Sequence, residues 1–239
     1  MRINILTIFP GFFEQALTLG ILGRAARAEL ADYRVVDLRD YTHDRHRTVD
    51  DEPYGGGAGM VMKPEPFFEA VDALRPAGPI VLLDARGRLF RHDDAVRLSL
   101  EPELTLLCGH YKDVDWRVAE GLATEVFSVG DFVLSGGEPA AICVVDAVVR
   151  LLPGSLGDHE SAASDSFYDE PILAPPAYTR PPDYRGMKVP EALRSGDHAA
   201  IGAWRRREAE RLTRELRPDL WERRQAGEPG RCPWSRTGR

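Results

Sequence analysis

Three glycine-bearing segments carry residues that could bind a small ligand. They run from Tyr54 to Met60, from Leu106 to Tyr111 and from Ser128 to Glu138. The second and third follow predicted strands, and ligands of open α/β sheets bind at the carboxyl ends of strands. A glycine there lets a ligand approach the backbone closely. These two segments predict a binding crevice, whereas the first has no Gly-Lys-Ser/Thr ending and is more typical of a flexible or tightly turning loop.

Two polar residues near the middle of the chain are further candidates. Arg150 ends a predicted helix, and Asp165 lies in the Ser-rich loop beyond it. A lone aspartate in such a loop usually forms a turn or caps a helix, so its position alone predicts no catalysis.

His43 and His46 are three residues apart, but no third ligand is near them. We therefore predict no metal-binding residues.

Short apolar segments alternate with helical ones over about the first 155 residues. Such alternation predicts an α/β domain with a largely parallel sheet. The predicted strands cover residues 3–9, 33–37, 80–84, 104–108 and 125–129, and the predicted helices cover 12–29, 64–74, 93–98, 116–122 and 138–152.

The rest of the chain predicts a second, smaller unit. A polar stretch without periodicity follows the last of these helices, and prolines then cluster up to Pro182. Beyond about Tyr184 the pattern is helical, with an apolar stripe formed by Ile201, Trp204, Leu212 and Leu216. We predict an α/β domain over 1–157, a flexible linker over 158–174 that carries Asp165, and a helical domain over 175–239 with a disordered tail.

Charge is distributed unevenly along the chain. The formal net charge is -7, yet residues 180–239 contain 15 Lys/Arg and only 9 Asp/Glu. A basic end on an acidic body suits a polyanionic partner such as a nucleic acid. A solvated, salt-bridged terminal helix would explain the same distribution.

Composition predicts a cytoplasmic protein with reduced thiols. No apolar run approaches the roughly 20 residues that a membrane span needs, and the first nine residues are typical of a strand, not of a signal peptide. The chain has three cysteines, Cys108, Cys143 and Cys232. Because their number is odd and their spacing fits no metal motif, we expect free, mostly buried thiols.

Several segments together match a known family. They lie at 42–51, 53–57, 108–111, 129–138, 165–167, 178–181 and 195–198. In order and spacing, from Met1 to about Leu220, the chain resembles the TrmD-type bacterial tRNA (guanine-N1)-methyltransferases. The resemblance implies a SPOUT α/β domain with a deep trefoil knot and a small C-terminal helical domain that binds tRNA. It also implies homodimers whose active sites are shared between subunits.

The resemblance also implies the reaction and the residues that carry it. The methyl donor would be S-adenosylmethionine and the product 1-methylguanosine at tRNA position 37. Asp165 matches the family's catalytic aspartate, which would accept the N1 proton. Arg150 matches its catalytic arginine, which would stabilise charge at O6. The donor pocket falls on Leu83, Gly109, Tyr111, Val129, Gly130, Asp131, Phe132, Val133, Leu134, Gly136 and Gly137, with Asp84 beside Leu83 at the start of the first knot-forming loop.

Two departures from the family pattern concern charge. Many relatives have Glu-Gly where this chain has Lys112-Asp113, and many have an acidic residue where it has Ala174. Asp113 could substitute in the first case, and Asp169 or Glu170 in the second. A magnesium (Mg2+) requirement, which the resemblance also raises, stays open.

Three other functions remain as alternatives. A knotted RNA-binding protein without catalysis would fit Lys112 and Ala174 but not the retention of Arg150 and Asp165. A SPOUT enzyme could act on another RNA or base. A nicotinamide-dependent oxidoreductase would need a glycine fingerprint after the first strand, where this chain has Pro10-Gly11-Phe12-Phe13.

Overall fold

A computed structural model describes residues 1–156 and 165–227. The chain divides into two compact units, Met1–Gly157 and Asp158–Arg239. The predicted disorder of the last ten residues lies outside the described part of the chain.

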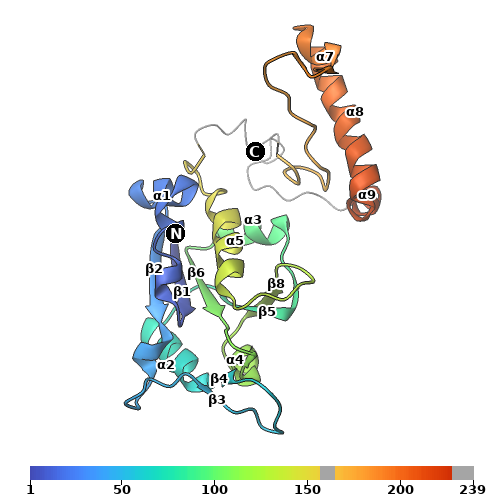
Figure 1. Cartoon of the computed structure of the whole chain (residues 1–239). Helices are drawn as coiled ribbons and strands as arrows, with labels where there is room; N and C mark the ends of the chain where they lie inside the picture. The colour runs from blue at the N-terminus through green and yellow to red at the C-terminus, as the bar shows by residue number, and fades with distance from the viewer. Residues whose placement is uncertain (157–164, 228–239) are drawn as a thin grey trace. The chain divides into compact units, whose positions relative to one another are not determined.

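The first unit is built on a five-stranded parallel sheet with the order β2-β1-β6-β5-β8 (Figure 1). This confirms the predicted α/β class with its parallel sheet. The strands are β1 (Arg2–Thr7), β2 (Asp32–Asp37), β5 (Ile80–Leu89), β6 (Glu103–Cys108) and β8 (Glu125–Ser128).

Helices cover both faces of this sheet. One face packs against α1 (Gly20–Arg27), α3 (His92–Ser99) and α5 (Glu138–Val149), and the other against α2 (Pro64–Leu74), α4 (Trp116–Gly121) and the 3-10 helix η3 (Leu38–Tyr41). Successive side chains of a strand point to opposite faces. In β1, Ile5 therefore joins the first core and Leu6 the second. Burial on both sides explains why the inner strands β1 and β6 are mainly apolar.

The chain between β1 and β2 differs from the long helix predicted over 12–29. It forms the 3-10 helices η1 (Pro10–Phe12) and η2 (Ala16–Thr18), and only then α1. Leu19 is extended and Gly20 has a φ of +55°, so the helix cannot continue through them. Gly23 lies so close to Thr18 that an added Cβ would come 1.9 Å from the Thr18 carbonyl oxygen. This close turn, which periodicity does not reveal, divides the segment.

Strand β5 continues beyond its predicted end through a bulge. Its register with β8 shifts between Leu83 and Arg88. At Gly87 a Cβ would lie 2.6 Å from backbone atoms of Phe127, so only glycine lets the two strands approach here. Residues 84–86 leave the regular pairing as a result.

A second, three-stranded sheet was not predicted, because its strands are only two residues long. It consists of β3 (Asp50–Asp51), β4 (Val61–Met62) and β7 (Asp113–Val114), in the order β3-β4-β7. The glycine-rich segment from Tyr54 to Met60 joins β3 to β4, and Tyr54 is fully exposed there.

The described residues of the second unit, 165–227, form a hairpin and three helices. The hairpin pairs β9 (Asp183–Tyr184) with β10 (Met187–Lys188), and α7 (Glu191–Arg194), α8 (His198–Leu216) and α9 (Pro218–Gln225) follow. The helices agree with the predicted helical unit, whereas the hairpin was missed. Arg185 and Gly186 form its turn with φ angles of +55° and +81°, the combination that a two-residue hairpin turn requires.

The predicted apolar stripe on α8 is partly wrong. Leu216 is 64% exposed, while Ala209 and Thr213 are the buried residues of this helix. The Thr213 hydroxyl accepts a hydrogen bond from the Leu173 N–H at 2.9 Å and donates one to the Ala209 carbonyl at 2.7 Å. Small side chains thus let the segment before the hairpin approach α8 closely.

Two of the three cysteines lie in the described part of the chain. Cys108 and Cys143 are free, as predicted. Cys108 is buried, but Cys143 is exposed on α5, so its predicted burial is wrong. Cys232 lies outside the described residues. Within residues 1–156 and 165–227, no helix is both long enough and apolar enough to cross a membrane.

The central strand β6 should dominate the stability of the first unit. Leu106 is fully buried between β1 and β5, whereas Leu100 is 60% exposed. We expect Leu106→Ala to lower the free energy of unfolding by about 2–5 kcal/mol because it leaves a cavity. The matched change Leu100→Ala should stay within about 0.5 kcal/mol. Urea unfolding of both variants measures the difference, and equal effects would contradict this description of the core.

Candidate active site

A pocket of about 340 Å³ opens at the carboxyl ends of β5, β6 and β8. Residues 84–86 after the first part of β5, 109–114 after β6 and 128–137 after β8 supply most of its lining. Because parallel strands end at the same edge of a sheet, the three loops meet there. The two glycine-bearing segments that predicted a crevice therefore form one pocket.

Glycines bring the backbones of two loops together beside the pocket. The Gly137 N–H donates to the Gly109 carbonyl at 2.8 Å. A Cβ at Gly137 would lie 2.8 Å from Cys108 Cα, and one at Gly109 would lie 2.6 Å from a methyl of Val114. Backbone groups consequently border the pocket without side chains in front of them. Such groups can hydrogen-bond the edge of a heterocyclic base.

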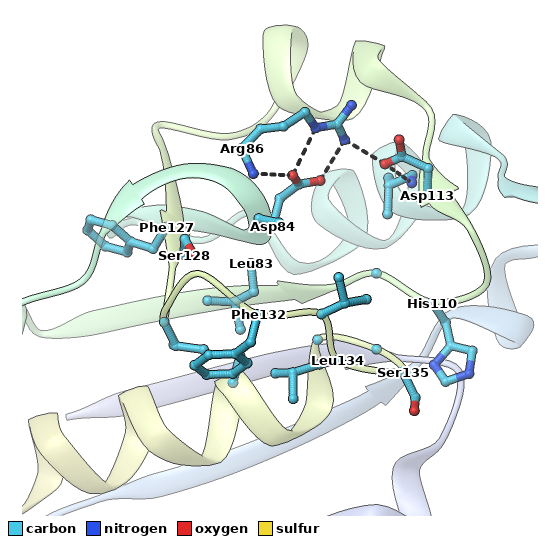
Figure 2. A pocket seen from close by; sticks show the side chains of 18 of the residues that line it. Leu83, Asp84, Arg86, His110, Asp113, Phe127, Ser128, Phe132, Leu134 and Ser135 are labelled. Carbon is cyan, nitrogen blue, oxygen red and sulfur yellow. Dashed lines mark hydrogen bonds and ion pairs between the residues drawn. The ribbon is translucent and has the colours of Figure 1, made fainter.

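One wall of the pocket is apolar. It includes Leu83, Val129, Phe132, Val133 and Leu134, and the pocket lining as a whole is more apolar than polar. Phe132 lies directly over Gly130, where a Cβ would come 2.2 Å from the ring. Phe132 and Leu134 face the pocket in Figure 2. Val133 is 93% exposed, so this apolar wall continues onto the protein surface.

The opposite wall is charged. Arg86 Nη2 lies 2.6 Å from an Asp84 oxygen and 2.5 Å from Asp113 Oδ1 (Figure 2). The Arg86 guanidinium also stacks 4.4 Å from the ring centroid of Trp116. Hydrogen bonds from Arg86 lower the pKa of Asp84 against the opposing effect of its partial burial. Asp84 is therefore ionised near neutral pH.

A buried carboxylate supports the base of the pocket. Glu138 is 2% exposed and begins α5. Its Oε1 accepts a hydrogen bond from the Thr7 hydroxyl at 2.8 Å, and its Oε2 lies 3.5 Å from His110 Nδ1. Burial, together with the charge of Glu138, raises the pKa of the Cys108 thiol. Cys108 is thus a structural residue, not a nucleophile.

The structure places nearly all of the predicted donor-binding residues along this pocket. Asp131 is the exception and does not line it. The lining also contains residues that the sequence analysis did not assign to the donor, above all Arg86, His110 and Asp113. The sequence did contain a signal for Arg86. It lies in a charged loop directly after Leu83, at the end of a predicted strand where a ligand was already expected.

Arg150 and Asp165 belong to different units. Arg150 is half-buried at the C-terminus of α5, whose N-terminus borders the pocket. The helix rises 1.5 Å per residue, so Arg150 lies about 20 Å along α5 from Gly137. Asp165 is exposed at the start of the described part of the second unit. Neither residue lines the pocket of its own chain.

Lys112 and Ala174 stand at the two positions where the chain departs from the family pattern, and the structure gives the contacts of both. Lys112 lines the pocket, and its stem packs over Gly59, where a Cβ would lie 3.1 Å from Lys112 Cβ. Ala174 donates its N–H to the Ser166 hydroxyl at 2.8 Å. Glu170 forms ion pairs with Arg224 at 2.6 Å and Arg206 at 3.1 Å. Its carboxylate is therefore already paired, whereas Asp169 is exposed.

The possible metal ligands among the described residues do not lie together. Over the described ranges, no group of three or more His, Cys, Asp or Glu side chains is arranged to bind an ion. His43 instead pairs with Glu69 at 2.8 Å.

These features define a class of protein. The fold is an open parallel α/β sheet with helices on both faces, and the pocket at its strand ends is the size of a small ligand site. Bare backbone, an apolar wall and a charged wall together suit a ligand with a flat heterocycle at one end and charged groups at the other.

Comparison with known proteins gives the family. The model of the family described as tRNA (Guanine-1)-methyltransferase TrmD matches residues 1–223. The chain is 52% identical over 227 residues to the tRNA (guanine-N(1)-)-methyltransferase of Anaeromyxobacter sp., which covers 93% of this chain and 91% of that protein. It is 50% identical over 224 residues to the one of Lacticaseibacillus paracasei, with 92% and 87% covered. The chain belongs to the TrmD family.

Membership confirms the resemblance found in the sequence. The family implies the SPOUT trefoil knot for the α/β unit and S-adenosylmethionine as the methyl donor. The pocket fits such a donor, because the glycine backbones and the apolar wall can take the adenosine and the charged wall can take the amino-acid end.

The ion pair in the charged wall should make stability depend on pH. The pKa of Asp84 is lowered in the folded state, so its contribution is present above the unfolded value of roughly 3.9 and is lost as pH falls through the folded pKa. We expect Asp84→Asn to cost about 1 kcal/mol at pH 7, because the half-exposed Arg86 is screened by solvent.

Urea unfolding between pH 7 and pH 3 measures this contribution. The difference between wild type and Asp84→Asn should shrink below about pH 4. Asp72→Asn, at an exposed position outside the pocket, is the matched control and should show no such trend. A difference that stays constant with pH would contradict the assignment.

Proposed function

We propose that this protein transfers a methyl group from S-adenosylmethionine to N1 of the guanosine at position 37 of tRNA. The observation that carries the proposal is the pocket at the ends of β5, β6 and β8 in a chain of the TrmD family. The names of its relatives, tRNA (guanine-N(1)-)-methyltransferases, supply the class of substrate and the target atom. A cytoplasmic location, where tRNA is processed, goes with this activity.

Asp165 is the proposed general base. Guanine N1 carries a proton and is a poor nucleophile near neutral pH. A carboxylate within hydrogen-bond reach accepts that proton as N1 attacks the methyl carbon. The donor, when bound, supplies a methyl group already activated on a sulfonium, so the protein's remaining task is to hold the two reactants in line. Asp165 is exposed, which leaves it accessible to an arriving base.

Arg150 is the proposed electrostatic stabiliser. Negative charge develops toward O6 of the base as N1 loses its proton, and a guanidinium stabilises that charge. Within one chain, Arg150 lies about 15 Å along α5 from Ala140, the nearest residue of this helix that lines the pocket, and this is farther than its side chain can reach. We therefore propose a homodimer in which Arg150 of one subunit serves the pocket of the other. The exposed apolar residues Phe132 and Val133 beside the pocket support such an interface.

The second unit is the proposed tRNA-binding part. Its hairpin presents Tyr184, Arg185 and Lys188 at the surface, with Arg185 stacked 5.2 Å from the Tyr184 ring. Exposed arginines continue along α8 at Arg205 and Arg207. Cations attract the phosphate backbone, and exposed aromatic rings can stack on unpaired bases.

A direct assay tests the reaction. Labelled S-adenosylmethionine is supplied with one tRNA transcript that carries guanosine at positions 36 and 37, and with another that carries adenosine at position 37. We expect label only in the first. Asp165→Asn should lower turnover by about a hundredfold or more, because a general base contributes that much, whereas Asp72→Asn, at an exposed position of α2 outside the pocket, is the control and should retain most activity.

Each other outcome points to a specific alternative. Label in both transcripts would indicate a SPOUT enzyme with another target base. Donor binding without any transfer would indicate a silent RNA-binding protein, as Lys112 and Ala174 suggested. The assay is run with and without a chelator, so that a need for Mg2+ is measured in the same experiment.

Shared active sites can be tested with mixed dimers. Ala85→Trp should fill the donor pocket from an exposed position outside the regular sheet pairing, and Arg150→Ala removes the guanidinium; each homodimer should be inactive. A heterodimer isolated with two different tags keeps one intact pocket that is served by an intact Arg150. We expect it to recover about half of the wild-type activity. A heterodimer as inactive as its parents would contradict the shared site, and unchanged melting temperatures confirm that both variants fold.

A further inference from the structure

The proposed reaction does not say which groups of the charged wall would bind the amino-acid end of the donor. Arg86 Nε donates to Asp84 Oδ1 at 2.9 Å, and Nη2 donates to Asp84 Oδ2 and to Asp113 Oδ1. Among the described residues, Nη1 of Arg86 has no hydrogen-bond partner. The guanidinium is held by two carboxylates and by Trp116, yet one of its edges remains available to a ligand.

Asp113 offers the complementary group. Its Oδ1 accepts hydrogen bonds from Arg86 Nη2 at 2.5 Å and from the Val114 N–H at 2.8 Å. Its Oδ2 has no partner in the part of the chain that the structure describes. Both residues line the pocket, and an available N–H donor of Arg86 and an available carboxylate oxygen of Asp113 flank the hydrogen bond that joins them (Figure 2). An α-amino acid presents the matching pair, a carboxylate next to an ammonium.

A second copy of the same local structure shows what is particular about Arg86. Asp115 and Arg117 repeat the Asp84–Arg86 arrangement, with the backbone N–H, Nε and Nη2 of the arginine all bonded to the aspartate two residues earlier. Arg117 is exposed and does not line the pocket. The aspartate–arginine pairing is thus a local feature of the chain. Of the two arginines, only Arg86 also bonds to Asp113 and lines the pocket.

We propose that Arg86 and Asp113 bind the amino-acid end of S-adenosylmethionine, with Arg86 Nη1 on its α-carboxylate and Asp113 Oδ2 on its α-ammonium. The inference rests on the donor pocket of the proposed function. The adenosine then lies toward the apolar wall of Phe132 and Leu134 and the backbone of Gly109.

The wall also distinguishes the donor from its product. Asp84, Arg86 and Asp113 together carry a net charge of -1. Lys112 also lines the pocket, but its ammonium lies beside Gly57 and forms no ion pair with them in the described part of the chain. S-adenosylmethionine carries a net charge of +1 and S-adenosylhomocysteine none. A wall of opposite charge therefore favours the donor over the spent product, which helps product release.

Calorimetry on the full chain without RNA tests the assignment with three probes. They are S-adenosylmethionine, S-adenosylhomocysteine and 5′-methylthioadenosine, which lacks the amino-acid end. Arg86→Met keeps an apolar stem over Trp116 and should raise the Kd of the first two by roughly ten-fold or more. The Kd of 5′-methylthioadenosine should not change. Asp113→Asn should weaken the donor more than the product.

Arg117→Met is the matched control and should leave all three Kd values as in wild type. Arg86→Lys keeps the charge without the planar fork, so it should weaken the amino-acid probes less than Arg86→Met. An equal loss for 5′-methylthioadenosine, or no loss for the donor, would overturn the inference. A wild-type chain that binds none of the probes would overturn it together with the donor pocket. Tight donor binding without RNA methylation would instead remove the proposed function and leave this inference standing.

Discussion

The backbone contact between the end of β6 and the start of α5 is the constraint on which the site depends. Gly137 bonds to Gly109 at 2.8 Å in a space where a Cβ would meet Cys108. That approach places the next residue, Glu138, inside the protein, where its carboxylate has to find partners. Thr7 from β1 and His110 from the loop after β6 provide them. A single close contact thereby ties two neighbouring strands and the helix together at the pocket.

The apolar wall and the charged wall of that pocket differ in their exposure and in the contacts that hold them. The apolar wall extends onto the protein surface at Val133, where the proposed dimer interface would cover it. The charged wall is complete within one chain, because Arg86 satisfies Asp84 and Asp113 at once. Binding of the donor can therefore be a property of the single chain. The proposed chemistry, which needs Arg150 from the other end of α5, depends on a partner.

Sequence predicted the features that repeat over many residues. The parallel sheet, the buried face of α5 and the glycine loops at strand ends all follow from apolar patterns and from residue types that tolerate close approach. Features set by one contact between distant residues were missed. The helix over 12–29 is broken by the fit of Gly23 against Thr18, and the stripe on α8 is displaced because Thr213 bonds to Leu173. Arg86 was overlooked for the same reason, since its partner Asp113 is 27 residues away.

The bulge in β5 places a residue that cannot be substituted, Gly87, next to residues 84–86, which can. Gly87 is closed to substitution, because any side chain would collide with the backbone of Phe127. Residues 84–86, just before it, leave the sheet pairing and face the pocket, so exchanges there alter its charge while the sheet stays intact. Lineages can thus drift in how they hold one end of the same ligand. A ligand that reaches this loop would therefore depend on the charge of its side chains, whereas one confined to the glycine backbones would not.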